Sequence, residues 1–287
     1  MNLKDKNLYY VGGVVRDKFL GLASLDVDYT YVGNAIEFAQ TRNVIKENKA
    51  FGTVRILGED NKEIDIASTR KEIYPRAGHL PKVVQIGCSL EEDLIRRDFT
   101  INAMACNTLD NKIVDPFGGQ ADIADKKLRV LHENSFKDDP TRIIRGLKFS
   151  VRFGFDLDEN TKLLQDQYLA SINYDMCYHR IKKELKETFN LNSKKAYDIF
   201  VGSGIYKLLG EKQSVPNLNL DIEQFLNNYS SPHIWLIYLG CFDLSKLELT
   251  RAEKRILEWF ERLKTQQPTN NTPEESILMH KIWNRDL

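Results

Sequence analysis

The residue pattern changes near residue 120, and this change constrains the fold more than any other feature of the chain. Before it, short runs rich in β-branched and aromatic residues alternate with turn signals; after it, only patterns with helical spacing remain. A doubly wound sheet would instead alternate strands and helices along the whole chain. The sequence also lacks the G-x-G-x-x-G and G-x-x-x-x-G-K-[ST] motifs. We therefore predict an α+β chain, with a small mixed-sheet head followed by a helical neck and a short helical body.

Particular segments carry this prediction. Ser89 and Glu92 form the pattern of a capping box, which predicts a helix running toward Met104. Asp139 and Pro140 predict the start of a helix, with Asp139 as its cap. Strands are expected at 8–11, 26–32, 53–57 and 63–67, with a further hairpin in 107–114; helices are expected at 141–153, 178–189, 194–209, 220–228, 233–239 and 251–263, followed by a linker at 265–274.

Composition excludes several classes of protein. Lys and Arg number 41, as do Asp and Glu, so the chain is not a globally basic nucleic-acid binder, although a local basic face is still allowed. The four cysteines form no C-x-x-C pair, which argues against a disulfide framework or structural zinc. No run approaches the ~20 apolar residues of a membrane span, and residues 1–6 lack a signal-peptide core. These features predict a cytoplasmic location.

Three carboxylates are candidates for a metal site. Asp26 and Asp28 share one face of the predicted strand, where a divalent cation would relieve their repulsion. Asp65 lies on another predicted strand and could complete the site if the two strands pair. The alternative is a solvated strand face or turn caps, and for D-x-D alone this is the commoner explanation.

A glycine pair lies between the first predicted strand and a helix. Gly12 and Gly13 would let backbone N–H groups turn toward an anion, and Arg16 follows about one helical turn later, where it suits a phosphate. A plain turn with an exposed arginine is the alternative.

Five motifs in order resemble one enzyme family. Residues 12–30 read G-G-V-V-R-D-K-F-L-G-L-A-S-L-D-V-D-Y-T, which resembles the nucleotidyltransferase signature of the polymerase-β superfamily. More narrowly, the chain is similar to the class II tRNA nucleotidyltransferase and bacterial poly(A) polymerase family. The other matching motifs are R-R-D-F-T-I-N-A at 96–103, D-P-F-G-G at 115–119, D-D-P-T-R at 138–142 and H-R-I-K-K-E-L at 179–185.

The resemblance implies three parts. Residues 1–122 would form the catalytic head, a polymerase-β-like palm. Residues 123–190 would form the neck with a nucleotide-recognition motif, and residues 191–287 a short RNA-binding body or tail. Fuller members of the family carry longer helical bodies than this. Position 179 is His where the family motif begins with Glu, so its role is open, as is the oligomeric state.

The resemblance also implies roles for individual residues. Asp26, Asp28 and Asp65 would be catalytic and would hold Mg²⁺. Arg97, Asp98 and Asn102 would contact the ribose; the alternative is surface pairing of Arg96 and Arg97 with Glu92 and Asp93. The full nucleotide-binding set is Gly12, Gly13, Arg16, Arg97, Asp98, Asn102, Asp139, Arg142, Arg145 and Arg152, and Arg180 and Lys183 would bind RNA.

Asp139 and Arg142 form the hypothesis for base selection. Cytosine and adenine both present an amino donor beside a ring-nitrogen acceptor, which an Asp–Arg pair can match. The alternative is that Asp139 only caps its helix and Arg142 forms a local salt bridge. For Arg145, Arg152, Arg180 and Lys183, a solvated helix face is equally consistent with the sequence.

The predicted function is template-independent addition of C and/or A, from CTP and ATP, to the 3′ end of tRNA. Alternatives are a poly(A) polymerase, an enzyme that adds only CC or only A, or a non-catalytic RNA-binding protein. The segment 74–81 resembles a loop of the family that could move between C and A addition, but its Pro and Gly content also suits an inert surface loop.

Overall fold

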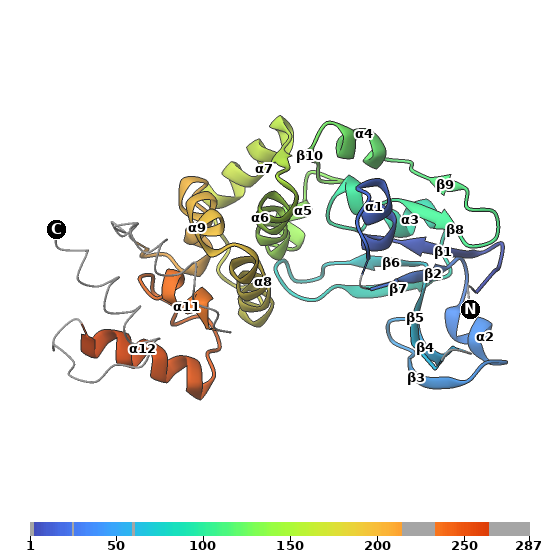
Figure 1. Cartoon of the computed structure of the whole chain (residues 1–287), viewed down its shortest axis with the longest axis horizontal. Helices are drawn as coiled ribbons and strands as arrows, with labels where there is room; N and C mark the ends of the chain where they lie inside the picture. The colour runs from blue at the N-terminus through green and yellow to red at the C-terminus, as the bar shows by residue number, and fades with distance from the viewer. Residues whose placement is uncertain (1–2, 25, 59–60, 214–232, 264–287) are drawn as a thin grey trace. The chain divides into compact units, whose positions relative to one another are not determined.

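The computed structural model describes residues 3–24, 26–58, 61–213 and 233–263 (Figure 1). The chain divides into two compact units. Unit 1 comprises Met1–Asp139 and Phe155–Leu164, and unit 2 comprises Pro140–Gly154 and Gln165–Leu287. Unit 1 therefore continues past the predicted head boundary at residue 122. The division into head, neck and body stays a prediction.

Unit 1 is built on a mixed seven-stranded sheet, which agrees with the predicted α+β class (Figure 1). The strand order is β3-β4-β5-β2-β1-β8-β9, and the pairing of β2 with β5 is parallel while the other neighbours are antiparallel. The strands are β1 Leu8–Val11, β2 Tyr29–Tyr31, β3 Val44–Asn48, β4 Thr53–Leu57, β5 Glu63–Ser68, β8 Ala105–Asn107 and β9 Ile113–Val114. β6 Arg70–Ile73 and β7 Lys82–Ile86 form a separate hairpin.

Alternation along the strands divides core residues from outward residues. Val54 and Ile56 of β4 and Ile66 of β5 are buried in one cluster, which also contains residues of α2 (Ala35–Ala39). Because side chains alternate across a strand, Arg55 and Asp65 point to the opposite face. The predicted hairpin of 53–57 with 63–67 is thus confirmed, with Arg55 directly opposite Asp65.

The predicted strand at 26–32 is shorter than expected. It begins at Tyr29, so Asp26 and Asp28 lie in the segment just before β2. The Val11 backbone N–H donates to the Asp28 carbonyl at 3.1 Å, which holds this segment beside the end of β1.

The predicted helix from Ser89 toward Met104 is correct only at its start. Ser89 and Glu92 form both bonds of the capping box, but the α-helix (α3, Leu90–Leu94) ends after five residues. Phe99 is extended, fully buried and bridged to Val130, and a short 3₁₀ turn follows at Thr100–Asn102. Burial of Phe99 therefore interrupts the helix that the local sequence favours.

Unit 2 is helical in the part that the structure describes. The predicted helix at 194–209 divides into α9 and a 3₁₀ turn at Ile205–Leu209, because Gly204 takes a left-handed conformation with φ of 69°. The predicted helix at 220–228 and linker at 265–274 lie outside the described residues. The helices are α6 Thr141–Phe153, α8 Tyr178–Leu191, α9 Ser193–Gly202, α11 Ile234–Leu239 and α12 Arg251–Leu263.

Several elements were not expected from the sequence. Most of them are short, and the others show only a weak periodicity of apolar residues, so the sequence pattern did not identify them. Besides α2, β3 and the β6–β7 hairpin, they are α4 Gly119–Ala124, α5 Ser135–Asp138, α7 Glu159–Ala170, and the paired strands β10 Lys127–Leu128 and β11 Asp156–Leu157. No helix within the described ranges is long and apolar enough to cross a membrane.

One carboxylate joins α12 to α8. Glu253 accepts a hydrogen bond from the Thr250 backbone N–H at 2.7 Å and from the Lys182 ammonium at 2.6 Å. Burial alone would raise the pKa of Glu253, but the bonds from Lys182 and Thr250 lower it below its ordinary value. Glu253, which forms reciprocal hydrogen bonds with Thr250 at the start of α12, is therefore also the counter-ion of a lysine on α8.

The D-P-F-G-G motif forms a turn that packs against the 3₁₀ segment. The Asp115 carboxylate accepts from the backbone N–H groups of Gly119 and Gln120 at 2.7 and 2.9 Å, which begins α4. A Cβ atom on Gly119 would lie 2.4 Å from the Thr100 carbonyl oxygen. Only glycine allows this approach.

We expect Gly119→Ala to destabilise the protein by about 1–3 kcal/mol, because the added methyl group must displace backbone. Urea unfolding followed by circular dichroism measures this change. Gly202→Ala is the control, since no atom lies within 4 Å of its Cβ position, and it should leave stability unchanged or slightly raised. Equal stability of Gly119→Ala and the unsubstituted protein would contradict the expectation.

Candidate active site

The turn after β1 lies against the side chain of an arginine. Gly12 has φ of 70° and ψ of −129°, a conformation that favours glycine, and α1 (Gly13–Phe19) starts directly after it. A Cβ on Gly12 would lie 3.2 Å from Nη1 of Arg97. The strand–turn–helix arrangement is as predicted, and an anion-binding role for this turn stays a prediction.

The parallel pairing of β2 and β5 brings two of the three candidate acids together. Tyr29 is opposite Ile66 in the register, so the residue before each, Asp28 and Asp65, lie at neighbouring positions on the face away from the core. Asp26 is two residues before Asp28 and, like it, is exposed.

The charges around Asp28 alter its pKa. Displacement of water by the surrounding protein raises the pKa of Asp28, the Arg97 guanidinium lowers it, and the negative charges of Asp26 and Asp65 raise it further; the net direction is upward. A bound cation would reverse this effect.

The Asp65 carboxylate is paired with arginine. Arg55 Nε and Nη2 donate to the two Asp65 oxygens, each at 2.8 Å, and Arg55 Nη1 donates to Glu63 at 2.8 Å. Within the described ranges, no three His, Cys, Asp or Glu side chains are placed to close around one metal ion. Asp26 and Asp28 supply hard oxygen donors in an incomplete set, which suits a divalent cation whose remaining ligands are water and substrate phosphates.

Arg97 is a cation next to this site, with 17% of its side chain exposed. Its Nη2 donates to Asp93 at 3.3 Å, while its Nε has no hydrogen-bond partner. Asp93 also accepts from Arg96, so the alternative of local ion pairing is present for both arginines. Glu92 instead pairs with Lys71 at 2.6 Å. A buried, unpaired N–H of a guanidinium is a ready donor for an anionic ligand.

Asp98 and Asn102 meet as predicted, although not on one helix. Asn102 Nδ2 donates to Asp98 Oδ1 at 2.9 Å. Arg16 Nη1 donates to Asn102 Oδ1 at 2.6 Å, and its Nε and Nη2 donate to Asp17. Arg16 is thus buried and bonded to Asn102 and Asp17, whereas the sequence suggested that it would face a phosphate. Its observed contacts orient Asn102, and the role of Asp17 was not apparent from the sequence.

The two residues predicted to select the base are both buried, with exposed fractions of 6% for Asp139 and 3% for Arg142. Asp139 ends unit 1, and Arg142 lies in the first turn of α6 in unit 2. α6 spans the predicted residues Thr141–Phe153, but Pro140 occupies its N-cap position, so the prediction of Asp139 as the cap is wrong.

The predicted basic residues of unit 2 have different surroundings. Arg145 pairs with Glu184 at 3.3 Å and lies over the Phe149 ring. Arg180 donates to Thr141 at 3.3 Å. Arg152, which lies over the Phe153 ring, and Lys183 are exposed. His179 is exposed, 3.8 Å from Glu248.

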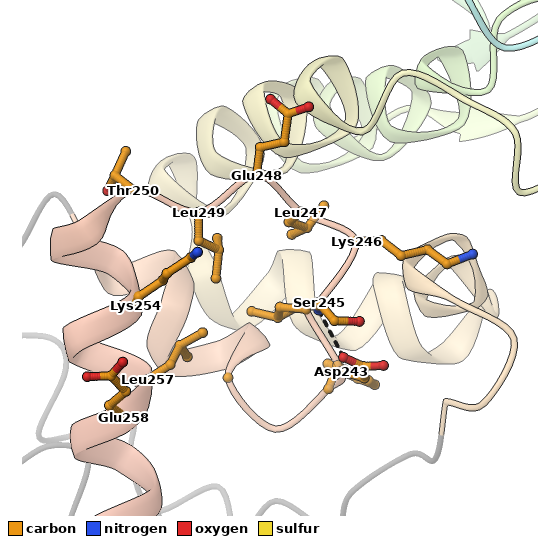
Figure 2. A pocket seen from close by; sticks show the side chains of 13 residues that line it. Asp243, Ser245, Lys246, Leu247, Glu248, Leu249, Thr250, Lys254, Leu257 and Glu258 are labelled. Atoms are coloured by element: carbon orange, nitrogen blue, oxygen red, sulfur yellow. Dashed lines mark hydrogen bonds between the residues drawn. The ribbon is translucent and has the colours of Figure 1, made fainter.

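A cavity of about 960 Å³ lies in unit 2, along the segment that leads into α12 (Figure 2). Its walls carry charges of both signs, including Lys246, Glu248, Lys254 and Glu258. None of the predicted site residues lines it. The cavity borders the motif at 179–185, because Glu248 in its wall accepts from Lys182 through its carbonyl at 2.6 Å.

Comparisons with known proteins agree with the motifs. Residues 8–129 match the family described as the poly A polymerase head domain. The A-adding tRNA nucleotidyltransferase of Halalkalibacterium halodurans is 32% identical over 301 residues, which cover 96% of this chain and 69% of that protein. The A-adding enzyme of Aquifex aeolicus is 46% identical over 168 residues, but they span only 20% of its length.

Solved structures show the same similarity. A CCA-adding enzyme in apo form II has a TM-score of 0.78 and 28% identity, over 95% of this chain and 74% of that one. The Thermotoga maritima CCA-adding enzyme complexed with tRNA has a TM-score of 0.76 and 26% identity, over 96% and 74%. Fold and motifs define a nucleotidyltransferase. The chain belongs to the class II tRNA nucleotidyltransferase family.

We expect Asp28→Asn to raise thermal stability at neutral pH. The raised pKa of Asp28 means that ionisation opposes folding above that pKa, and the opposition disappears below the ordinary value near 3.9. The melting temperature should therefore rise by roughly 1–2 °C at pH 7 and be unchanged near pH 3. Asp65→Asn, which breaks the pair with Arg55, should give no such rise and serves as the control. A lower melting temperature for Asp28→Asn at pH 7 would contradict the expectation.

Proposed function

We propose that this chain adds A, C or both, from ATP and CTP, to the 3′ end of tRNA without a nucleic-acid template. The observation that supports the proposal is the parallel register of β2 and β5, which puts Asp28 beside Asp65 on the face away from the core, while Arg97 lies against the Gly12 turn. Membership in the family supports the substrate class.

The proposed site divides the work among its residues. Asp26, Asp28 and Asp65 would hold Mg²⁺, which when bound would neutralise the triphosphate and lower the pKa of the primer 3′-hydroxyl. The backbone N–H groups after Gly12 and the unpaired Nε–H of Arg97 would donate to phosphate oxygens. Catalysis of this kind depends mainly on positioning and on charge.

Asp98 and Asn102 would recognise the ribose. Both are buried and bonded to each other, and Arg16 fixes the orientation of the Asn102 amide because it donates to the amide oxygen. That bond directs the Asn102 NH₂ group toward Asp98, so the orientation of the pair is set before substrate arrives. Arg16 would then act as a positioning residue behind the ribose site, rather than on a phosphate.

Base selection would rest on Asp139 and Arg142. A base that leaves a buried donor or acceptor unmatched costs about 1–3 kcal/mol for each such group, which disfavours GTP and UTP. Arg180 and Lys183 are the proposed contacts to RNA. Arg152 is a proposed contact to the nucleotide, as is Arg145 once its pair with Glu184 opens.

The relatives favour addition of the terminal A as the first activity to examine. The relative aligned with 96% of this chain is an A-adding enzyme, as are two further relatives aligned with 55% each. Addition of all three nucleotides is the second candidate, since the similar solved structures are of CCA-adding enzymes.

We expect purified protein with Mg²⁺ to add A to tRNA that ends after the second C, and to stop after one residue. The assay offers each NTP singly to tRNAs ending before the first C, after the first C and after the second C. Asp26→Asn should lower the rate about a thousandfold, equivalent to about 4 kcal/mol. The control is Asp110→Asn, at an exposed turn. A long A tail on generic RNA would indicate a poly(A) polymerase, and no incorporation on any substrate would refute the proposal.

We expect Asp139→Ala to reduce discrimination between ATP and GTP by about ten- to a hundredfold, because one acceptor for the amino group is lost. The ratio of kcat/KM for the two nucleotides measures the change. Asp138→Ala is the neighbouring control, and its ratio should stay within threefold of the unsubstituted protein. Unchanged discrimination in Asp139→Ala would remove this residue from base selection.

A further inference from the structure

We infer that Arg55 is a positioning residue that holds Asp65 away from the metal site until a divalent cation displaces it. This inference rests on the proposed function, in which Asp65 is a metal ligand. Arg55 lies outside the five motifs that resemble the family.

The geometry shows a closed pair. Arg55 and Asp65 are directly opposed in the antiparallel register of β4 and β5. Two parallel bonds of 2.8 Å join the guanidinium to both carboxylate oxygens, so each oxygen already has a donor. This two-bond arrangement is the geometrically most specific form of an Arg–carboxylate contact. A cation that uses Asp65 must compete with it for the same oxygens.

The pair lies on the face that carries the other acids. Asp65 is next to Asp28 across the parallel register, and the charge of Asp65 acts on Asp28. The guanidinium of Arg55 therefore occupies the edge of an acidic cluster, where a positive charge is needed when no metal is bound. Arg55 and a divalent cation satisfy the same electrostatic requirement.

The pair is suited to exchange because water reaches it. The side chain of Arg55 is 42% exposed and that of Asp65 is 59% exposed. Solvent-exposed pairs of this kind contribute little net stability. The pair can thus open without unfolding its strands, whereas a buried pair could not.

Glu63 gives the released guanidinium a second partner. Arg55 Nη1 already donates to Glu63 at 2.8 Å, and Glu63 lies two residues before Asp65 on the same face of β5. When Asp65 turns to a cation, the Glu63 contact can keep Arg55 on the strand. Glu63 and Asp65 are thus alternative hydrogen-bond partners for Arg55.

The test is direct binding of Mn²⁺ to the full chain, measured by electron paramagnetic resonance of free Mn²⁺ at low salt and without nucleotide. We expect Arg55→Gln to bind Mn²⁺ about tenfold more tightly, since a unit charge about 5 Å from a divalent ion is removed. Arg55→Lys, which keeps the charge but loses the two-bond contact, should fall between the two. Arg42→Gln removes the same charge from a site bonded to the Phe38 carbonyl and should not change the affinity. Thermal unfolding checks that each variant is folded.

The outcomes separate this inference from the proposed function. If Arg55→Gln binds Mn²⁺ no more tightly than the unsubstituted protein, while Asp28→Asn binds it more weakly, the role of Arg55 is overturned and the metal site stands. If Asp28→Asn binds as the unsubstituted protein does, the metal site itself is wrong. An equal gain in Arg42→Gln would show that net charge is responsible, and would also overturn the role of Arg55.

Discussion

The parallel pairing of β2 with β5 is the constraint on which the site depends. Parallel neighbours need a long connection, and here the chain between them forms α2, β3 and β4 before it returns. Because of this parallel pairing, the residue just before β2 and a residue of β5 lie side by side on one face. Asp28 and Asp65, 37 positions apart in the printed sequence, become electrostatic neighbours in this way. The buried cluster on the other face fixes that register, because a slip of one residue would turn Ile66 outward.

Local patterns predicted much of this fold and of its site. Alternation in 53–57 and 63–67 identified the hairpin, and the Gly12–Gly13 pair marked the turn at which Arg97 lies. Asp98 and Asn102 were expected together on a helix; they do meet, but in a turn. The reason is Phe99, whose burial against the rest of unit 1 outweighs the helix signal of its own segment. Tertiary packing of one side chain is not visible in a window of the sequence.

The contacts that could not be predicted join residues that are far apart in the sequence or that lie outside any motif. Arg55 belongs to none of the motifs, and only the register of β4 and β5 brings it into contact with Asp65. Arg16 was identified as a phosphate ligand from its position after the glycines, yet its partner Asn102 lies 86 positions away. Charge and spacing indicate which residues are capable of a role. Which partner each one takes depends on the fold.

Glu253 bonds the Thr250 backbone at the start of α12 and also pairs with Lys182 on α8, which has a consequence for shorter versions of this chain. A fragment that stops before Thr250 would lack α12 and would also leave the Lys182 ammonium, only 12% exposed in the intact unit, without its counter-ion Glu253. The damage would then reach α8, the helix that carries His179, Arg180 and Lys183. A usable truncation should therefore keep α12 whole, even where its surface contributes nothing to chemistry.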